Sequence, residues 1–451
     1  MLITHSLRMT LHPMRRIPDW TSLDTAARQR LRESARENAD VLNAVLNAFV
    51  QIEPPRAGSS GTLGGLPYAA KDMLRTPAHQ PSGGLAIAGN LGIIGHSDLL
   101  ERLDTAGADR IGFTNMTELA YEPSGFNASR GRVKNPWSLD HVPGGSSSGS
   151  AAAVASGAVA AALGSDTGGS LRIPAHCCGI TAWKPTYGQV STRGAMPLAP
   201  SLDTIGLLAR GAADLLPLTT ILADLPASSP VRRGVLLRDV LAQCTPAIAQ
   251  ACSDLADVLT GSGIAVERRD ALPAIDAIDA HALTVMFAES ARVHRARIDD
   301  PAVASVLRRR LAKGLEVTDD ALATSIGARP RLIADFEDQV LAGADVVVLP
   351  VMTIGTPSAA ECDPASNHFS PKTLYAMSRF TRFVNMLGFP AVALPAGFDK
   401  HGLPVAMQII GRPGSDLALL DLVRHVQTMT DWHGRVPTAI AALAPQTEPT
   451  A

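Results

Sequence analysis

Two short stretches rich in serine and glycine decide how this sequence is interpreted. Residues 144–150 are GGSSSGS, and residues 165–174 are SDTGGSLRIP. Glycine and serine leave room around the backbone, so that successive N–H groups can converge on one oxygen atom or one anion. The two stretches therefore indicate either a site built from backbone donors or tight turns around a buried helix.

Other known site patterns match parts of these stretches. Gly145–Gly149 fits the Gly-x-Ser-x-Gly nucleophile elbow, with Ser147 as nucleophile, but the elbow needs a hydrophobic strand before the serine. The preceding residues, NPWSLDHVPGG, contain two prolines and no such strand, although a helix is expected afterwards, over residues 150–164. Asp166-Thr167-Gly168 matches an aspartic-protease loop, yet that site needs a second aspartate from a similar lobe, and the triplet occurs once. A phosphate-binding loop would need a Gly-Lys-Ser/Thr or Gly-x-Gly-x-x-Gly turn, and neither is found in the required place.

A third stretch, GGLPYAAKD at residues 64–72, ends an apolar run with Lys71. An ammonium group is costly to bury unless it is paired or deprotonated. Asp72 would be the obvious ion-pair partner of a structural lysine. Beside two serine-rich loops, a neutral buried lysine would instead serve as a general base. The residues alone leave both interpretations open.

Taken together, the three stretches resemble the amidase signature family. Lys71 lies in GLPYAAKD, Ser146 is the first serine of GGSSSGS, and Ser170 lies in DTGGSLR, 24 residues later (170 − 146). The flanking segments NMTELAY, NPWSLDHVPGG, KPTYGQVSTRG and SLDTIG are also similar to the family. The detailed similarity covers 63–210 and resumes weakly at VVVLPV and at FPAVALPAGFDKHGLPVAMQIIG. Ser148, where many members have glycine, and the N-terminal arm depart from the pattern.

The resemblance implies amide hydrolysis through a serine acyl-enzyme. It makes Ser170 the nucleophile, Ser146 a bridging serine that follows a cis peptide bond, and Lys71 the base. The backbone donors expected to form the oxyanion hole are the N–H groups of Thr167, Gly168, Gly169 and Ser170.

Further residues are expected to support this site or to line it. The expected supporting residues are Ser147 and an ion pair of Asp166 with Arg172. The expected walls of the substrate pocket are Tyr121, Phe126 and Met73. The resemblance implies no cofactor, and no cluster of His, Cys and Asp has metal-ligand spacing, so no metal is expected.

The same resemblance, with the alternation of helix and strand signals, predicts an α/β fold. The expected architecture is one large domain with a central mixed β-sheet flanked by helices on both faces. Residues 1–56 are expected to form an N-terminal helical arm, with a helix over 21–50, and residues 57–451 the amidase signature domain. A variable, mostly helical region is expected at about 230–345, around a strand at RRGVLL.

Composition limits the kinds of partner. The formal net charge is −2, from 40 basic and 42 acidic residues, and no block of like charge indicates binding to nucleic acid or to a membrane. The five cysteines form no C-x-x-C pair, which favours a reducing compartment. The first residues lack the continuous apolar core of a signal peptide. We expect a cytoplasmic protein that acts on a small-molecule amide, with a possible homodimer.

Three functions are compatible with these residues. The first is a stand-alone amidase that hydrolyses a carboxylic amide to an acid and an amine or ammonia. The second is the A subunit of a tRNA-dependent amidotransferase, a glutaminase that resembles the same family and needs a partner chain. The third is a non-catalytic scaffold of the same fold, against which the presence of Lys71, Ser146 and Ser170 argues.

Overall fold

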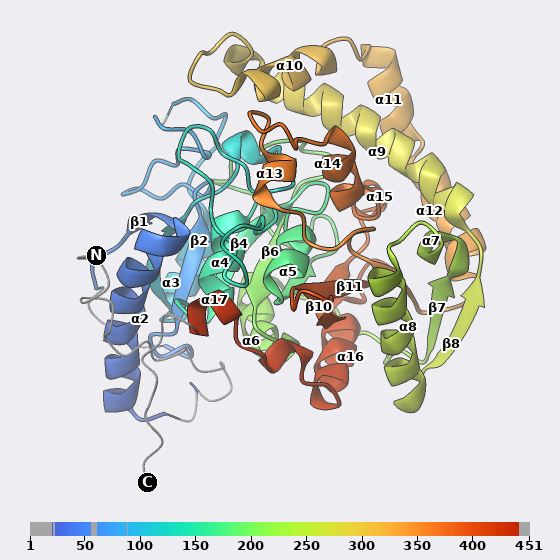
Figure 1. Cartoon of the computed structure of the whole chain (residues 1–451), viewed down its shortest axis with the longest axis horizontal. Coiled ribbons are helices and arrows are strands. Elements are labelled where there is room, and N and C mark those ends of the chain that lie inside the picture. Colours follow the sequence, from blue (N-terminus) through green and yellow to red (C-terminus); the bar gives the residue numbers. More distant parts are fainter. Residues whose placement is uncertain (1–19, 21–22, 56–60, 88, 442–451) are drawn as a thin grey trace.

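The fold is organised around one large mixed β-sheet (Figure 1). The computed structural model describes residue 20 and residues 23–55, 61–87 and 89–441. The strands are β1 (Phe49–Ile52), β2 (Pro67–Lys71), β3 (Asp109–Thr114), β4 (Ala161–Asp166), β5 (Thr181–Lys184), β6 (Thr204–Ala209), β7 (Arg233–Leu237), β8 (Ala265–Arg269), β9 (Val346–Pro350), β10 (Ala391–Phe398) and β11 (Pro404–Gly411). They form an eleven-stranded sheet in the order β1-β3-β2-β4-β6-β5-β10-β11-β9-β7-β8.

The sheet contains two groups of parallel strands on either side of an antiparallel centre. β2 pairs in parallel with β3 and β4, and β7 pairs in parallel with β8 and β9, whereas the central pairs from β4 to β9 are antiparallel. Every residue of β2, β3, β4 and β6 is buried, as expected for strands covered on both faces. The predicted mixed sheet is confirmed.

Helices cover both faces of the sheet. They are α2 (Thr25–Leu46), α3 (Asp98–Thr105), α4 (Ser148–Ala155), α5 (Arg172–Cys178), α6 (Ala212–Leu222), α7 (Arg238–Leu241), α8 (Pro246–Gly261), α9 (Leu272–Val293), α10 (Ser305–Gly314), α11 (Asp319–Gly327), α12 (Arg329–Phe336), α13 (Ala359–Cys362), α14 (Pro371–Ser378), α15 (Arg382–Leu387), α16 (Asp416–Thr428) and α17 (Thr438–Ala441). α4 packs against α5, and α6 packs against α16, each pair over the central strands. The expected α/β architecture is confirmed, and no helix of the described residues is long and apolar enough to cross a membrane.

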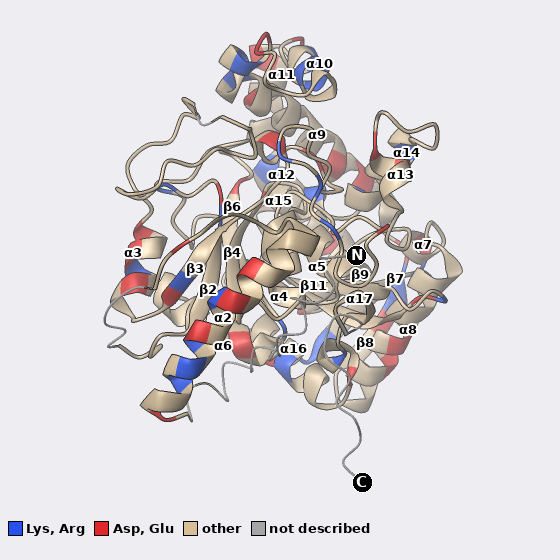
Figure 2. Cartoon of the chain, turned by 60° about the vertical axis from the view of Figure 1, so that its left-hand side comes forward, with Lys and Arg blue, Asp and Glu red and all other residues tan. Residues whose placement is uncertain are grey.

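The N-terminal helix is shorter than the sequence predicts. Asp24 caps the start of α2 by accepting a hydrogen bond from the Ala27 N–H, and Asn47 ends the helix in the left-handed conformation. The chain then enters the edge strand β1, so the prediction of one helix over 21–50 is wrong at its C-terminal end. Basic and acidic residues lie close together on α2 and α3 (Figure 2). The boundary at residue 56 stays a prediction, and the chain start falls outside the described residues.

The alanine-rich stretch after the first serine loop contains a helix and a strand. The prediction of a single helix over 150–164 is wrong, because α4 ends at Ala155 and β4 begins at Ala161. Gly157, with a φ of 79°, turns the chain between them. Alanine favours a helix, but pairing of β4 with β2 on one side and with β6 on the other buries this segment as a strand and overrides that local preference.

The region over 230–345 is mostly helical, as predicted. It contains two neighbouring strands, β7 and β8, where the sequence indicated one. α9 contacts α10, α11, α12 and α15, and in Figure 1 the helices α9–α12 form an arc along one margin of the molecule. This arc places α9 and α10 near the loop that follows β4.

A buried ion cluster attaches α2 to the sheet. Asp109, at the start of β3, accepts hydrogen bonds from Arg32 Nε (2.9 Å) and from both terminal nitrogens of Arg36 (2.8 Å each). Asp109→Ala is expected to lower the free energy of unfolding by about 3–5 kcal/mol, because it leaves two arginines without their buried carboxylate. Denaturant unfolding monitored by circular dichroism measures this change.

The matched control is Asp270→Ala, which removes an ion pair with Arg238 in which both side chains are more than half exposed. Solvent screens such pairs, so no measurable change is expected. Equal unfolding midpoints for the two variants would contradict the structural role given to Asp109.

Candidate active site

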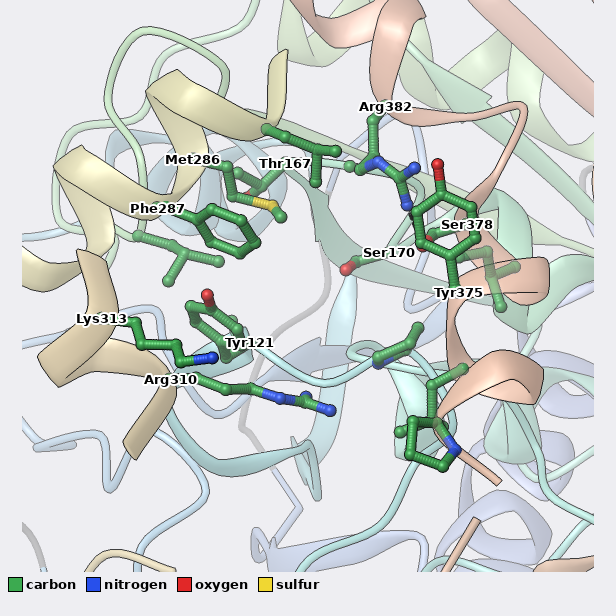
Figure 3. Close-up of a pocket in the computed structure, with 18 residues that line it drawn as sticks. Tyr121, Thr167, Ser170, Met286, Phe287, Arg310, Lys313, Tyr375, Ser378 and Arg382 are labelled. Carbon is green, nitrogen blue, oxygen red and sulfur yellow. Dashed lines mark hydrogen bonds between the residues drawn. The ribbon is translucent and has the colours of Figure 1, made fainter. Parts of the chain in front are cut away.

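A cavity of about 350 Å³ opens beside the loop that follows β4. Thr167, Gly168 and Ser170 form part of its lining, and α9, α10 and α14 supply most of the opposite wall. Figure 3 shows Ser170 near the centre, with Met286, Phe287 and Tyr121 on one side and Tyr375, Ser378 and Arg382 on the other. The predicted nucleophile is therefore accessible from a cavity large enough for a small molecule.

Lys71 lies at the end of β2, among the hydroxyl groups of three serines. Its Nζ donates to Ser146 Oγ (2.7 Å), Ser165 Oγ (2.7 Å) and Ser147 Oγ (3.1 Å). The Gly145–Ser146 peptide bond is cis. The Ser147 N–H donates to the Ser170 carbonyl oxygen (3.3 Å), which joins the two serine segments. The structure thus brings together Lys71 and Ser146, and Ser147 contributes to the same cluster.

Asp72 is not the ion-pair partner of Lys71. Its carboxylate accepts a hydrogen bond from the Ser82 N–H (3.2 Å) and another from the Ser82 hydroxyl, and it pairs with His79 Nε2 (2.8 Å). The side chain of Asp72 is therefore engaged away from the serine cluster. Of the two interpretations left open by the sequence, the structural ion pair with Asp72 is excluded.

The environment of Lys71 shifts its protonation equilibrium toward neutrality. Burial lowers the pKa of Lys71 from its ordinary value to about 7, and the negative charges of Asp166 and Asp203 limit the fall. The three hydroxyl groups around Nζ carry no charge, so they solvate the amine without fixing it as a cation. Burial therefore makes the neutral amine accessible at a much lower pH than for an ordinary lysine.

Asp166 and Arg172 form the expected ion pair behind the loop. Arg172 donates from Nε to Asp166 Oδ2 (3.0 Å) and from a terminal nitrogen to Oδ1 (2.9 Å), and both residues are fully buried. Burial alone would raise the pKa of Asp166, but the charge and hydrogen bonds of Arg172 hold that pKa well below its usual range. The Leu171 N–H also donates to this carboxylate (3.1 Å), so the pair fixes the path of the backbone around Ser170.

The expected set of oxyanion donors needs a correction at Gly169. The Gly169 N–H donates to Asp166 Oδ1 (2.8 Å), and Gly169 does not belong to the cavity lining. Thr167, Gly168 and Ser170 do belong to it. The physical reason is that adjacent peptides in a tight turn face different ways, so only some of the N–H groups face the cavity.

Two of the three expected pocket residues lie elsewhere. Tyr121 lines the cavity that contains Ser170. Phe126 instead lines a smaller cavity of about 30 Å³. Met73 lines another, of about 80 Å³, together with Ser165. Both of these smaller cavities share lining residues with the cavity of Ser170, so Phe126 and Met73 lie next to the predicted site without lining it.

The cavity residues that the sequence did not indicate come mainly from the helical region over 230–345. α9 contributes Met286 and Phe287, α10 contributes Arg310 and Lys313, and α14 contributes Tyr375. Figure 2 shows basic residues on α10, whose sequence SVLRRRLAKG contains no acid. This run of arginines was the one available signal, since apolar residues on a helix do not distinguish a cavity wall from a core.

The histidines and cysteines near the serines are held by hydrogen bonds or buried. His141 Nδ1 bonds with Ser138 Oγ (2.8 Å), and His176 Nδ1 accepts from the Ala406 N–H (3.1 Å). Burial lowers the pKa of His176 to about 4, and burial raises that of Cys177 to about 12. In the part of the chain that the structure describes, no three His, Cys, Asp or Glu side chains are grouped as metal ligands.

The sequence matches the amidase family over residues 26–420. The chain belongs to the amidase family. Like its relatives, it is a hydrolase that acts on carbon–nitrogen bonds, so the resemblance predicted from the three motifs is confirmed.

Individual relatives include amidotransferase subunits and an amidase. The A subunit of the glutamyl-tRNA(Gln) amidotransferase of Nitrosococcus oceani is 32% identical over 470 residues, which covers 91% of this chain and 95% of the relative. A crystal structure of an amidase is 28% identical, with a TM-score of 0.79, and covers 90% of this chain and 100% of its own. The structure of the A subunit from Thermotoga maritima is 25% identical, with a TM-score of 0.76 and 96% of each chain covered.

Proposed function

We propose that this protein hydrolyses a small carboxylic amide through an acyl-enzyme on Ser170. The observation that carries the proposal is the contact of Lys71 Nζ with Ser146 Oγ (2.7 Å), in a fully buried cluster next to a serine that lines a cavity. A lysine whose pKa is about 7 is suited to accept a proton at neutral pH. A non-catalytic scaffold would not require a buried lysine in contact with Ser146 beside the cavity of Ser170.

In the proposed reaction, a proton is transferred from Ser170 to Ser146 and another from Ser146 to Lys71. Neutral Lys71 accepts a proton from Ser146, Ser146 accepts one from Ser170, and the Ser170 oxygen attacks the amide carbon. The relay then reverses and protonates the departing nitrogen as the carbon–nitrogen bond breaks. Water attacks the ester on Ser170 by the same relay and releases the acid.

The negative oxygen formed by this attack needs donors that are already in place. We assign that role to the backbone N–H groups of Thr167, Gly168 and Ser170, because these three residues line the cavity. Removing one such donor typically costs about 3–4 kcal/mol of transition-state stabilisation. Gly169 is left out of the set because its N–H is bonded to Asp166.

The charges around the cavity favour a substrate that carries an anionic group. Arg310 and Lys313 line it without an acidic residue in the described lining, and the third cation, Arg382, is paired with Asp279. Glu122, in the neighbouring small cavity with Arg310, is half-buried, and burial raises the pKa of its carboxyl group. An amide with a carboxylate at one end and an apolar body fits this distribution.

A second candidate is the glutaminase subunit of an amidotransferase. The comparisons favour it, because the N. oceani relative at 32% identity is such a subunit. The cavity favours a stand-alone amidase, because the α-ammonium group of glutamine would need a carboxylate that the described lining does not contain. We therefore place the anionic amide first.

The first prediction concerns the nucleophile. A fluorophosphonate should label Ser170 and no other serine, because Ser170 combines a relay with a cavity that admits the reagent. Peptide mass mapping locates the adduct. Ser170→Ala should abolish labelling, whereas Ser148→Ala, which removes a buried hydroxyl without a hydrogen-bond partner in the described residues, should leave it unchanged. An adduct on Ser147 would support a nucleophile elbow instead.

The second prediction concerns the base. The neutral lysine is the competent form, so kcat/KM should rise with pH through a value of about 7 and level off on the alkaline side. Lys71→Met should lower kcat/KM by roughly 10²–10⁴-fold and remove the rise.

Lys184 provides the matched control for this pH profile. Burial also lowers its pKa to about 7, but its Nζ donates to the Pro185 carbonyl oxygen (2.7 Å). Lys184→Met should therefore keep the rise with pH. If Lys71→Met retains the wild-type profile, the relay as written is wrong.

The third prediction concerns the substrate class. A monoamide with a terminal carboxylate should be hydrolysed with a kcat/KM about 10- to 100-fold above that of its neutral methyl ester, the range expected for charge-assisted hydrogen bonds. Arg310→Met should remove the preference, and Arg309→Met, on the exposed side of α10, should keep it. Preferential hydrolysis of glutamine, or activity that requires a co-purifying second polypeptide, would support the amidotransferase subunit.

A further inference from the structure

Both polar ends of the Gly168–Gly169 peptide are held by side chains. The Gly168 carbonyl oxygen accepts a hydrogen bond from Thr381 Oγ1 (2.6 Å), and the Gly169 N–H donates to Asp166 Oδ1 (2.8 Å). Thr381 lies 213 residues further along the chain than Gly168. The peptide in the middle of the proposed oxyanion turn is thus fixed at one end by a carboxylate of the same turn and at the other by a threonine far along the chain.

Thr381 lies at a helix start, where a threonine hydroxyl ordinarily caps the helix backbone. It is the N-cap residue of α15, a place where threonine usually accepts a hydrogen bond from the helix backbone. Its side chain makes no capping bond, and the hydroxyl instead lies close to Gly168 O, with the Ser378 carbonyl oxygen more distant at 3.2 Å. The side chain is fully buried and does not line the cavity, so it contacts no substrate there.

Without these two hydrogen bonds, the Gly168–Gly169 peptide would flip more easily than any other peptide of the loop. A peptide flip changes ψ of the first residue and φ of the second, and both residues here are glycines, which tolerate the widest range of these angles. A flip would turn the Gly168 carbonyl oxygen toward the Asp166 carboxylate, where the Gly169 N–H now donates, and would break both hydrogen bonds. The backbone angles next to this peptide would change with it, so the N–H groups of Gly168 and Ser170 would lose the orientation that stabilises the oxyanion.

The surrounding contacts reinforce the observed orientation. Gly169 has a φ of 125°, and a Cβ atom built on it would lie 2.8 Å from Thr381 Cβ, so the threonine packs directly against this glycine. One turn further along α15, Asn385 Nδ2 donates to the Asp166 carbonyl oxygen (2.8 Å) and to Oδ1 (3.0 Å). The start of α15 therefore contacts the loop on both sides of the peptide.

We propose that Thr381 is a positioning residue of this enzyme, which acts with Asp166 to fix the Gly168–Gly169 peptide and so directs the N–H groups of Gly168 and Ser170 into the oxyanion hole. The proposal rests on the function proposed for Ser170 and adds the group that holds its donors in place. Because Thr381 acts through the backbone, its loss should affect the transition state more than the bound substrate.

The test compares Thr381→Val, which removes the hydroxyl at nearly constant shape, with Thr381→Ser, which retains it. Thr381→Val should lower kcat by about 10- to 100-fold, a part of the effect of losing a whole oxyanion donor, with KM within about threefold of the wild type. The rate of phosphonylation of Ser170 by a fluorophosphonate should fall by a similar factor, because the phosphoryl oxygen occupies the same hole. Thr381→Ser should restore both rates.

A readout that needs no substrate separates this proposal from the proposed function. Hydrogen exchange of the peptide spanning residues 167–172 should accelerate in Thr381→Val, since the Gly169 N–H loses its fixed orientation. The same result is expected of Thr381→Ala, a second variant without the hydroxyl. Thr219→Val removes another buried hydroxyl, which donates to the Leu216 carbonyl oxygen within α6, and should leave labelling and exchange unchanged.

Two outcomes would overturn the role of Thr381. One is a Thr381→Val protein that labels and exchanges at wild-type rates. The other is a Thr381→Ser protein as slow as Thr381→Val, which would mean that packing rather than the hydroxyl matters. Failure of the proposed function appears on a different variant, as amide hydrolysis that survives Ser170→Ala.

Discussion

The buried carboxylate of Asp166 is the constraint on which the site depends. A charged carboxylate without water needs several donors, and Asp166 obtains them from Arg172, from the N–H groups of Gly169 and Leu171, and from Asn385. Each of these donors is thereby fixed relative to the others. Leaving a buried charge without its partner costs about 3–5 kcal/mol, so the loop cannot relax toward a different path at small cost. The turn before Ser170 is rigid because a charge in its centre has to be satisfied.

The same burial has opposite consequences for the two charged residues at the centre of the site. Asp166 is paired with Arg172 and stays ionised, whereas Lys71 contacts only hydroxyl groups, so burial lowers its pKa to about 7. The charge of Asp166 still raises the pKa of Lys71, but desolvation of the buried amine has the larger effect. A lowered pKa alone does not make a lysine the base of the proposed relay. The pKa of Lys184 is also lowered to about 7, but its amine donates to the Pro185 carbonyl oxygen. Contact with Ser146 distinguishes the proposed base.

The sequence predicted the parts of the site that a short pattern can encode. Lys71, Ser146 and the Asp166–Arg172 pair lie in motifs whose small residues are required by the backbone path itself, and the structure brings them together. The helix and strand within 150–164 could not be separated, because alanine carries little information about pairing and β4 is a strand only through its neighbours. The use of the Gly169 N–H could not be predicted either, since the direction of one peptide depends on a carboxylate and on a threonine far along the chain.

The site residues that the sequence did not indicate share one physical property, which is that they lie on helices outside the motifs. The motif residues lie within the segment from Lys71 to Arg172, whereas the groups that orient the loop and face the substrate come from α9, α10 and the start of α15. A helix that lines a cavity needs only a few suitable side chains at one end of one face. So few positions produce no periodic pattern in the sequence. Thr381 therefore becomes recognisable only when the fold places it beside Gly168, whereas Arg310 had one signal in the sequence, the run of arginines in α10. In such an architecture, the chemistry can stay constant in the motifs while the choice of substrate changes in the helices that face them.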